Sequence, residues 1–384
     1  MRITFLIPHD HASGGMRAVH EYSRHLIARG HGVRILMGRF GLLSGRTGRP
    51  LTAPQILERR LRRAWKPLRR FPLDAWRFGP KTAFRALRGA ASGRHASSCL
   101  APAVTPVFID RVDADSVPEA DALIVYDWSS AIAASTLPEK CGRQCYFVQA
   151  EETLLGAPAD FAEAALRLPC RKIVVSSWLK TALKERHGQE AEGPVISGVD
   201  FDQFQNVSSE DERVGRVGMI YWSAPYKGSR NGLRAFELAR RQVPGLCLVS
   251  FSRELPDLRL PARTRFHYDP PQDELKRIYS SCAIWLSPSL MEGSGMPVQE
   301  AMACGCAVVA TDVGGVRDFG RDGGNLVIVS PGDTEAMAAQ IVRLCGDDTL
   351  RRRIAAAAET DIRAFTWAAA AERMEEILAR DVER

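Results

Sequence analysis

The sequence predicts an α/β fold made of two doubly wound Rossmann-like domains. Short apolar runs rich in Val, Ile and Leu alternate with amphipathic helical patterns, which is typical of parallel strands covered by helices on both faces. The alternation occurs in two series, and the polar stretch at residues 207–213 separates them. A chain of 384 residues is also long enough for two domains of ordinary size.

The first series predicts a domain over residues 1–207. The apolar run at residues 3–8 predicts a buried strand, and the helix after it places Val19, Tyr22, Leu26 and Ile27 on one face. Further strands are predicted at residues 33–37, 122–126, 144–149 and 172–177, with a helix from residue 178 to a stop at Gly188. A basic insertion at about residues 44–100 interrupts this series.

The second series predicts a domain over residues 208–364. The expected strands lie at residues 217–222, 247–251, 283–287, 307–311 and 326–330. Helices are expected at residues 233–242, 273–281, 297–305 and 333–345. The final segment, residues 365–384, predicts one more helix, which could pack back on the first domain.

Composition excludes several classes of protein. No stretch approaches the roughly 18–20 uninterrupted apolar residues of a membrane span, and the start of the chain does not have the pattern of a signal peptide. The nine cysteines are an odd number without a CxxC pair, which indicates reduced thiols in a cytoplasmic protein rather than a disulfide scaffold.

The net charge of +7 is concentrated in one segment. Residues 46–94 contain fourteen Lys or Arg and two acids, so this segment carries +12 and the remainder −5. Large apolar residues such as Trp65, Phe71 and Trp76 lie between the cations, a pattern that suits an anionic membrane surface or an anionic acceptor. The alternative is a set of solvated helix faces. Nucleic acid is not expected as a partner, because no binding motif accompanies the charge.

A glycine loop predicts a phosphate site in the second domain. Gly293 and Gly295 follow a predicted strand, and Pro297 suits the first turn of the next helix. Glycines before a helix let backbone N–H groups approach an anion, whose charge the helix dipole favours. Glu292 and Glu300 bracket this loop and could accept hydrogen bonds from sugar hydroxyls, or could be a surface loop residue and a solvated helix residue.

With these residues in place, the chain resembles the retaining glycosyltransferases of family four, which have the GT-B fold. Glu292 and Glu300 match the E-x7-E segment of that family. Other matching blocks follow in the family's order: Gly14-Gly15, residues 176–180, 196–204, 226–228 and 323–333. The run YFVQAEE at residues 146–152 is similar to the bacterial rhamnosyltransferase-like members. The resemblance implies two Rossmann-like domains facing across a cleft.

The resemblance also implies a donor site. Glu300 would bind the nucleotide ribose, Glu292 would contact the donor sugar, and Lys227 would neutralise the diphosphate unless it is an ordinary surface lysine. The residues expected to surround the diphosphate are Gly14, Gly15, Gly293, Ser294, Gly295, Met296, Pro297 and Val298. The family usually has an arginine where this chain has Trp222, so Arg230 is the candidate replacement, although it could equally be solvated.

Candidate acceptor-side residues lie in the first domain. The family often has a histidine at the position of Gln149, which cannot act as a proton shuttle. Glu151 or Glu152 could serve as a base or be solvated, and Asp127 and Trp128 are expected near the acceptor. No DxD-type carboxylate pair ends a strand, so no metal is expected, and His9, Asp10 and His11 lack further ligands at a suitable spacing.

The resemblance implies transfer of a hexose or deoxyhexose, with rhamnose the leading candidate, from a dTDP, UDP or GDP sugar. The expected acceptor is a glycan or lipid-linked saccharide of surface polysaccharide synthesis, and residues 46–94 would hold the enzyme at the inner face of the membrane. No cofactor is expected beyond the nucleotide sugar. One alternative is a non-catalytic GT-B-like binding protein acting through the basic segment. A dinucleotide-dependent oxidoreductase is disfavoured, because the loop HDHASGGM lacks the GxGxxG spacing.

Overall fold

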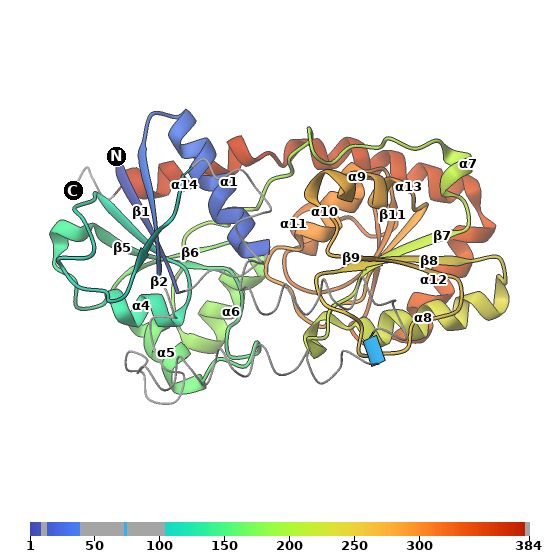
Figure 1. Ribbon diagram of the computed structural model, residues 1–384, viewed down its shortest axis with the longest axis horizontal. Helices are drawn as coiled ribbons and strands as arrows, with labels where there is room; N and C mark the ends of the chain where they lie inside the picture. Colours follow the sequence, from blue (N-terminus) through green and yellow to red (C-terminus); the bar gives the residue numbers. More distant parts are fainter. Residues whose placement is uncertain (9–13, 39–72, 75–103, 381–384) are drawn as a thin grey trace. The chain divides into compact units, whose positions relative to one another are not determined.

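The computed structural model describes residues 1–8, 14–38, 73–74 and 104–380. The chain forms two compact units: unit 1 is Met1–Ile196 with Trp367–Arg384, and unit 2 is Ser197–Thr366. Each has a parallel six-stranded sheet between helices, which confirms the predicted fold class (Figure 1). The division falls after Ile196 rather than after residue 207, because Val199 and Phe204 belong to the apolar core of unit 2.

The sheet of unit 1 has the strand order β3-β2-β1-β4-β5-β6, and all of its pairings are parallel. The strands are β1 (Arg2–Ile7), β2 (Gly32–Gly38), β3 (Val107–Ile109), β4 (Ala122–Val125), β5 (Arg143–Val148) and β6 (Arg171–Val174). The strand order reverses direction between β1 and β4, and ligands of such sheets bind beside this point at the carboxyl ends of the strands. β3 was not predicted, because it is a three-residue edge strand with two exposed residues.

Helices cover both faces of this sheet, with α1 and α14 on one face and α4, α5 and α6 on the other (Figure 1). Their bounds are α1 (Gly14–Ala28), α4 (Trp128–Ala134), α5 (Ala159–Arg167), α6 (Ser177–His187) and α14 (Trp367–Ala379), with a 3-10 turn η1 at Glu139–Cys141. The C-terminal helix α14 packs on α1. Arg29, just after α1, forms ion pairs with Glu372 and Glu375, and the rings of Trp367 and Tyr22 meet edge-on with their centroids 5.2 Å apart.

The sheet of unit 2 repeats the same topology, with the order β12-β11-β10-β7-β8-β9. Its strands are β7 (Arg216–Ile220), β8 (Cys247–Ser252), β9 (Thr264–Tyr268), β10 (Ile284–Ser287), β11 (Ala307–Thr311) and β12 (Val327–Val329). β9 was missed because the strand carries Arg265 and His267 and has no continuous apolar run.

Two apolar clusters cover the two faces of this second sheet. One surrounds Tyr279 and Trp285, and the other surrounds Phe236 and Leu344. The helices are α7 (Glu210–Arg213), α8 (Ser229–Gln242), α9 (Gln272–Ser280), α10 (Met296–Ala303), α11 (Val316–Phe319), α12 (Thr334–Gly346) and α13 (Asp348–Asp361), with 3-10 turns η2 (Pro225–Lys227) and η3 (Ile362–Ala364). Side chains packed on both faces explain why the strands of this sheet other than β9 are largely apolar.

Among the described residues, no helix is long and apolar enough to cross a membrane. The eight cysteines that the structure describes are all free thiols. Apart from Leu73 and Asp74, the basic segment 46–94 lies outside the described residues, and so do His9, Asp10 and His11.

Candidate functional site

The loop between β10 and α10 has the form of an anion-binding loop. Gly295 has a left-handed backbone with φ of 88°, Pro297 occupies the first turn of α10, and no side chain caps the helix. The Oγ atom of Ser294 is buried and has no hydrogen-bond partner among the described residues. A helix start with open N–H groups and an unpartnered hydroxyl suits an anion with several oxygen atoms.

Lys227 and Glu292 form an ion pair beside this loop. Lys227 ends η2, after β7, and its Nζ lies 2.8 and 2.9 Å from the two carboxylate oxygens of Glu292. The side chains are 24% and 13% exposed, so neither is an ordinary solvated surface residue. The structure therefore brings together two of the three residues predicted to be catalytic.

Gly228 allows the two loops to approach. Its φ is 64°, and a Cβ atom there would lie 1.9 Å from the carbonyl oxygen of Pro288. The backbone N–H of Leu290 also donates to the carbonyl of Tyr226 at 2.7 Å. Only glycine combines this backbone with this contact, and the close approach brings Lys227 within reach of Glu292.

Ser289 fixes the Glu292 carboxylate from the other side. The Ser289 hydroxyl donates to Oε1 of Glu292 at 2.8 Å, and Ser289 itself is buried. Thr311, at the end of β11, donates to the carbonyl oxygen of Ser289. This role of Ser289 could not be predicted, because a hydrogen bond between two loops produces no regular spacing of residues in the sequence.

Glu300 is buried rather than solvated, with 5% of its surface exposed. The hydroxyl of Tyr279 on α9 donates to its Oε2 at 2.8 Å. Tyr279 is a second residue of the site that sequence reasoning missed, since its helical pattern marks it only as apolar.

Trp222, Arg230 and Arg253 also lie close in sequence to the carboxyl ends of β7 and β8. The Trp222 backbone N–H donates to Oγ of Ser229 at 2.9 Å, which fixes the end of β7 to the start of α8. Arg230 is the second residue of α8 and is exposed. Arg253, which follows β8, has a half-buried side chain that is 23% exposed.

Gly14 and Gly15 are the first residues of α1 in unit 1, at the carboxyl edge of its sheet. A Cβ atom on Gly15 would lie 2.1 Å from Oη of Tyr126 and 2.7 Å from Oε1 of Gln149. The glycine therefore lets the helix start lie against side chains that follow β4 and β5. Gln149 is packed here, at the position where the resemblance implied a histidine.

Asp127 and Trp128 have structural roles within unit 1. Asp127 is the N-cap of α4, and its carboxylate accepts the N–H of Ser130 at 2.8 Å in a capping box. Trp128 stacks on Phe161 with ring centroids 5.5 Å apart. The sequence DWSS carries the capping signal, so the cap could have been predicted.

Glu151 is buried and Glu152 is half-buried, so neither is a solvated loop residue. Oε2 of Glu151 lies 3.1 Å from Nε2 of His187. Oε2 of Glu152 accepts hydrogen bonds from the Tyr146 hydroxyl and the Trp128 N–H, each at 2.9 Å. Burial, with the negative charge of Asp127 as the second cause, raises the pKa of Glu152 to about 8.

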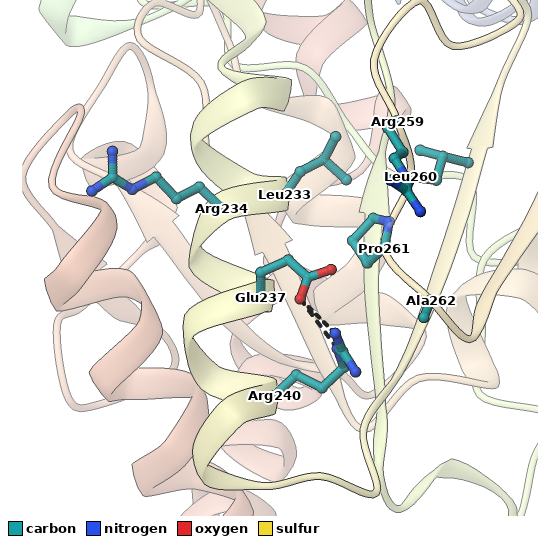
Figure 2. Close-up of a pocket in the computed structure, with 8 residues that line it drawn as sticks. All are labelled: Leu233, Arg234, Glu237, Arg240, Arg259, Leu260, Pro261 and Ala262. Atoms are coloured by element: carbon teal, nitrogen blue, oxygen red, sulfur yellow. Dashed lines mark hydrogen bonds and ion pairs between the residues drawn. The ribbon is translucent and has the colours of Figure 1, made fainter.

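Within the described ranges, no group of three or more His, Cys, Asp or Glu side chains could hold a metal ion. A hollow of about 410 Å³ lies between α8 and residues 259–262. Figure 2 shows Glu237 and Arg240 bonded to each other there while Arg234 points away. None of the predicted site residues lines it.

Sequence comparison relates parts of this chain to known glycosyltransferases. Residues 211–347 match the family model described as "Glycosyl transferases group 1". The chain is 36% identical over 115 residues to the D-inositol 3-phosphate glycosyltransferase of Corynebacterium diphtheriae, covering 30% of this chain and 27% of the relative. It is 31% identical over 97 residues to the O-antigen chain mannosyltransferase B of Escherichia coli, covering 25% of each chain. The chain thus spans about a quarter of the length of these curated relatives.

A solved structure matches over the whole chain. Anabaena Alr3699/HepE in complex with UDP and glucose has a TM-score of 0.68 and 15% identity, covering 99% of this chain and 100% of that one. At this identity the likeness establishes the fold, which is that of the GT-B glycosyltransferases. The two named relatives are a D-inositol 3-phosphate glycosyltransferase and a mannosyltransferase, and neither name specifies rhamnose.

Proposed function

We propose that this protein is a retaining glycosyltransferase that moves a hexose or deoxyhexose from a nucleoside diphosphate sugar to a hydroxyl acceptor. The observation that carries the proposal is the Lys227–Glu292 ion pair beside the open N-terminus of α10. The pair provides a cation for phosphate and a carboxylate for sugar hydroxyls within one rigid loop cluster. The match of residues 211–347 to the glycosyltransferase family model supports the same reaction class.

In this reaction the bond between the sugar C1 and the diphosphate oxygen breaks, and negative charge develops on the leaving diphosphate. The backbone N–H groups of residues 293–298 and the ammonium of Lys227 would stabilise that charge, with Arg230 as a further cation. The acceptor hydroxyl attacks C1 from the face that the diphosphate leaves, and its proton passes to a diphosphate oxygen. Glu300 would hold the ribose and Glu292 the donor sugar, while Gly14 and Gly15 of unit 1 would contact the donor.

The finer substrate assignment is a further part of the proposal. A dTDP, UDP or GDP sugar would serve as donor, with rhamnose as the first sugar to test. The acceptor would be a glycan or lipid-linked saccharide of surface polysaccharide synthesis, and the name of the E. coli relative supports this direction. The acceptor-side residues would be drawn from Asp127, Trp128, Gln149, Glu151 and Glu152. The carboxylates of Asp127, Glu151 and Glu152 already have partners within unit 1. To contact an acceptor, these carboxylates would have to leave their partners, or backbone groups of the same residues would contact it instead.

The basic segment 46–94 would hold the enzyme at the cytoplasmic face of the membrane, where each cation near an anionic surface adds about 1 kcal/mol. Vesicles rich in anionic lipid should sediment the protein at low salt and release it at high salt. If neutral vesicles sediment the same fraction of the protein as anionic vesicles do, this part of the proposal is contradicted.

A nucleotide titration tests the reaction class. Calorimetry or thermal shift with dTDP, UDP, GDP and ADP should show stabilisation by one diphosphate, about 2.7 kcal/mol at a hundredfold excess over its Kd. Glu300→Ala should remove most of the effect, whereas Glu335→Ala, an exposed glutamate on α12, should not. NMR of the product made with the selected sugar nucleotide then reports the anomeric configuration. If no diphosphate binds at millimolar concentration, the alternative is favoured: a non-catalytic protein acting through its basic segment.

A further inference from the structure

Three hydrogen bonds reach the Glu292 carboxylate from the described part of the chain, and one of them comes from a neutral group. Lys227 donates to Oε1 and Oε2 at 2.8 and 2.9 Å, and the Ser289 hydroxyl donates to Oε1 at 2.8 Å. A carboxylate oxygen has two lone pairs. Within the described residues, Oε1 therefore uses both of its lone pairs, whereas Oε2 keeps one for a ligand.

Ser289 is held in place by the ends of two neighbouring strands. It lies two residues after the end of β10 and is only 4% exposed. Thr311, the last residue of β11, directs its hydroxyl at the carbonyl oxygen of Ser289 and, at 3.2 Å, at that of Ser287. The position of the Ser289 hydroxyl is therefore set by the sheet rather than by solvent.

The backbone of Glu292 is fixed against the loop that follows β11. Gly314 has φ of 59°, and a Cβ atom there would lie 2.4 Å from the carbonyl oxygen of Glu292. The Gly315 N–H donates to the carbonyl oxygen of Gly293 at 2.9 Å. A fixed backbone leaves the side-chain torsions of Glu292 as its remaining freedom, and the hydrogen bond from Ser289 restrains those torsions.

A diphosphate bound at this loop would compete with Glu292 for the Lys227 ammonium. The ammonium has three N–H donors, and it already directs them at both oxygens of the Glu292 carboxylate. A phosphate oxygen is anionic like the carboxylate and attracts the same cation. The Ser289 hydroxyl is neutral and buried, so the phosphate does not draw it away. The hydrogen bond from Ser289 would therefore persist while Lys227 turns toward the phosphate.

We propose that Ser289 is a positioning residue for the sugar transfer. By occupying Oε1, it keeps the Glu292 carboxylate oriented so that Oε2 accepts a hydroxyl of the donor sugar while Lys227 contacts the diphosphate. The inference rests on the proposed function and deepens it, because it gives the two partners of Glu292 different tasks.

Titration calorimetry of the full chain with each nucleoside diphosphate and its sugar nucleotide tests the assignment. The probe pairs are UDP with UDP-glucose, dTDP with dTDP-rhamnose and GDP with GDP-mannose. Ser289→Ala should weaken sugar-nucleotide binding on the order of tenfold and change diphosphate binding by less than about twofold, because Glu292 contacts only the sugar. Ser289→Thr keeps the hydroxyl and should recover most of the sugar-nucleotide affinity. Glu292→Gln should show the same selective loss as Ser289→Ala.

Ser280→Ala is the matched control. Ser280, the last residue of α9, is also buried, and its hydroxyl donates to the carbonyl oxygen of Gln205 at 3.1 Å. This variant should bind both ligands like wild type, even if urea denaturation shows that it loses as much stability as Ser289→Ala. Thr311→Val provides a second test that leaves the Ser289 hydroxyl in place but frees its backbone. It should weaken sugar-nucleotide binding selectively, by a smaller factor than Ser289→Ala.

The outcomes separate this inference from the proposed function. If Ser289→Ala binds the sugar nucleotide as well as wild type does, the role of Ser289 is overturned and the proposed function stands. Equal losses for the diphosphate and the sugar nucleotide also overturn it, because they indicate a disturbed loop. If Glu292→Gln shows no selective loss, Glu292 does not hold the sugar, and the inference fails while the diphosphate site stands. If wild type binds no diphosphate at all, the proposed function fails and the role of Ser289 fails with it.

Discussion

Lys227 and Glu292 belong to separate loops of unit 2, yet the Lys227 ammonium lies within 2.9 Å of both oxygens of the Glu292 carboxylate. Each group thus satisfies the other before any ligand arrives. The ion pair holds a cation and a carboxylate at fixed positions. A diphosphate that binds beside them would therefore contact a Lys227 side chain whose position Glu292 has already set. Such preorganisation lowers the cost of stabilising a developing charge.

Removal of either partner should therefore impair catalysis more than folding. Lys227→Met should reduce kcat/KM by about a hundredfold or more, because a fixed charge beside the leaving group is lost. It should also lower the free energy of unfolding by about 1–3 kcal/mol, because Glu292 keeps a half-buried carboxylate without its partner. Nucleotide release assays and urea denaturation measure the two effects. A Lys227→Met variant with wild-type activity would exclude Lys227 from the reaction, whatever its stability.

The close packing of Gly15 against Tyr126 predicts that a substitution of Gly15 is destabilising and that a second substitution partly reverses the effect. Gly15→Ala should disturb the start of α1, because the new Cβ would lie 2.1 Å from the Tyr126 hydroxyl. Tyr126→Phe removes that oxygen and leaves ring carbon Cζ at 3.0 Å as the next Tyr126 contact. The double variant should therefore melt closer to wild type than Gly15→Ala does. Thermal denaturation of the four proteins gives the coupling, and simple addition of the two single effects would show that the clash is unimportant.

Glu152 should make the stability of unit 1 depend on pH. Burial and the charge of Asp127 raise its pKa from 4.5 to about 8. Between these pH values the unfolded chain has released the proton while the folded protein retains it, so the free energy of unfolding falls as pH rises. Glu152→Gln should remove this contribution and lose less stability between pH 5 and pH 8 than wild type.

Urea denaturation at pH 5, 6, 7 and 8 tests the Glu152 prediction. Glu163→Gln changes a side chain on α5 that is 44% exposed, and it serves as the matched control that should follow wild type. If Glu152→Gln and wild type show the same slope against pH, the carboxyl group is ionised in the folded protein at neutral pH.

Much of the fold could be predicted because its strands are covered on both faces. Strands such as β1 and β4 bury nearly every residue, so the sequence shows them as continuous apolar runs. β3 and β9 lack that coverage, and their sequences contain no such run. The parallel order followed from the alternation of strands with helices, whereas the division of the chain at Ile196 depended on contacts that no local pattern records.

Without the family resemblance, the candidate site could be predicted only where its chemistry is carried by residues close in sequence. The glycine loop, Glu292 and Glu300 lie within nine residues and stand out together. The groups that fix them come from elsewhere: Tyr279 on α9 was missed, and Lys227 in the loop after β7 was predicted only through the family resemblance. Burial of Glu300 was also unpredictable, because α10 is buried nearly all round and has no polar face to mark. The N-cap role of Asp127, by contrast, could be predicted, because the capping signal lies within the local sequence DWSS.

The C-terminal helix supplies a prediction about the stability of unit 1. Trp367 begins α14 and is 2% exposed, and its ring meets that of Tyr22 edge-on at 5.2 Å. Trp367→Ala should lower the free energy of unfolding by about 3–5 kcal/mol, because it opens a cavity between α14 and α1. Arg373→Ala alters an arginine on the same helix that is 41% exposed and should cost less than about 1 kcal/mol. Denaturation followed by circular dichroism measures both variants, and limited proteolysis near residue 366 should cut Trp367→Ala faster than Arg373→Ala. Equal stability of the two variants would mean that the ion pairs of Arg29 with Glu372 and Glu375, rather than the aromatic contact, hold α14 on unit 1.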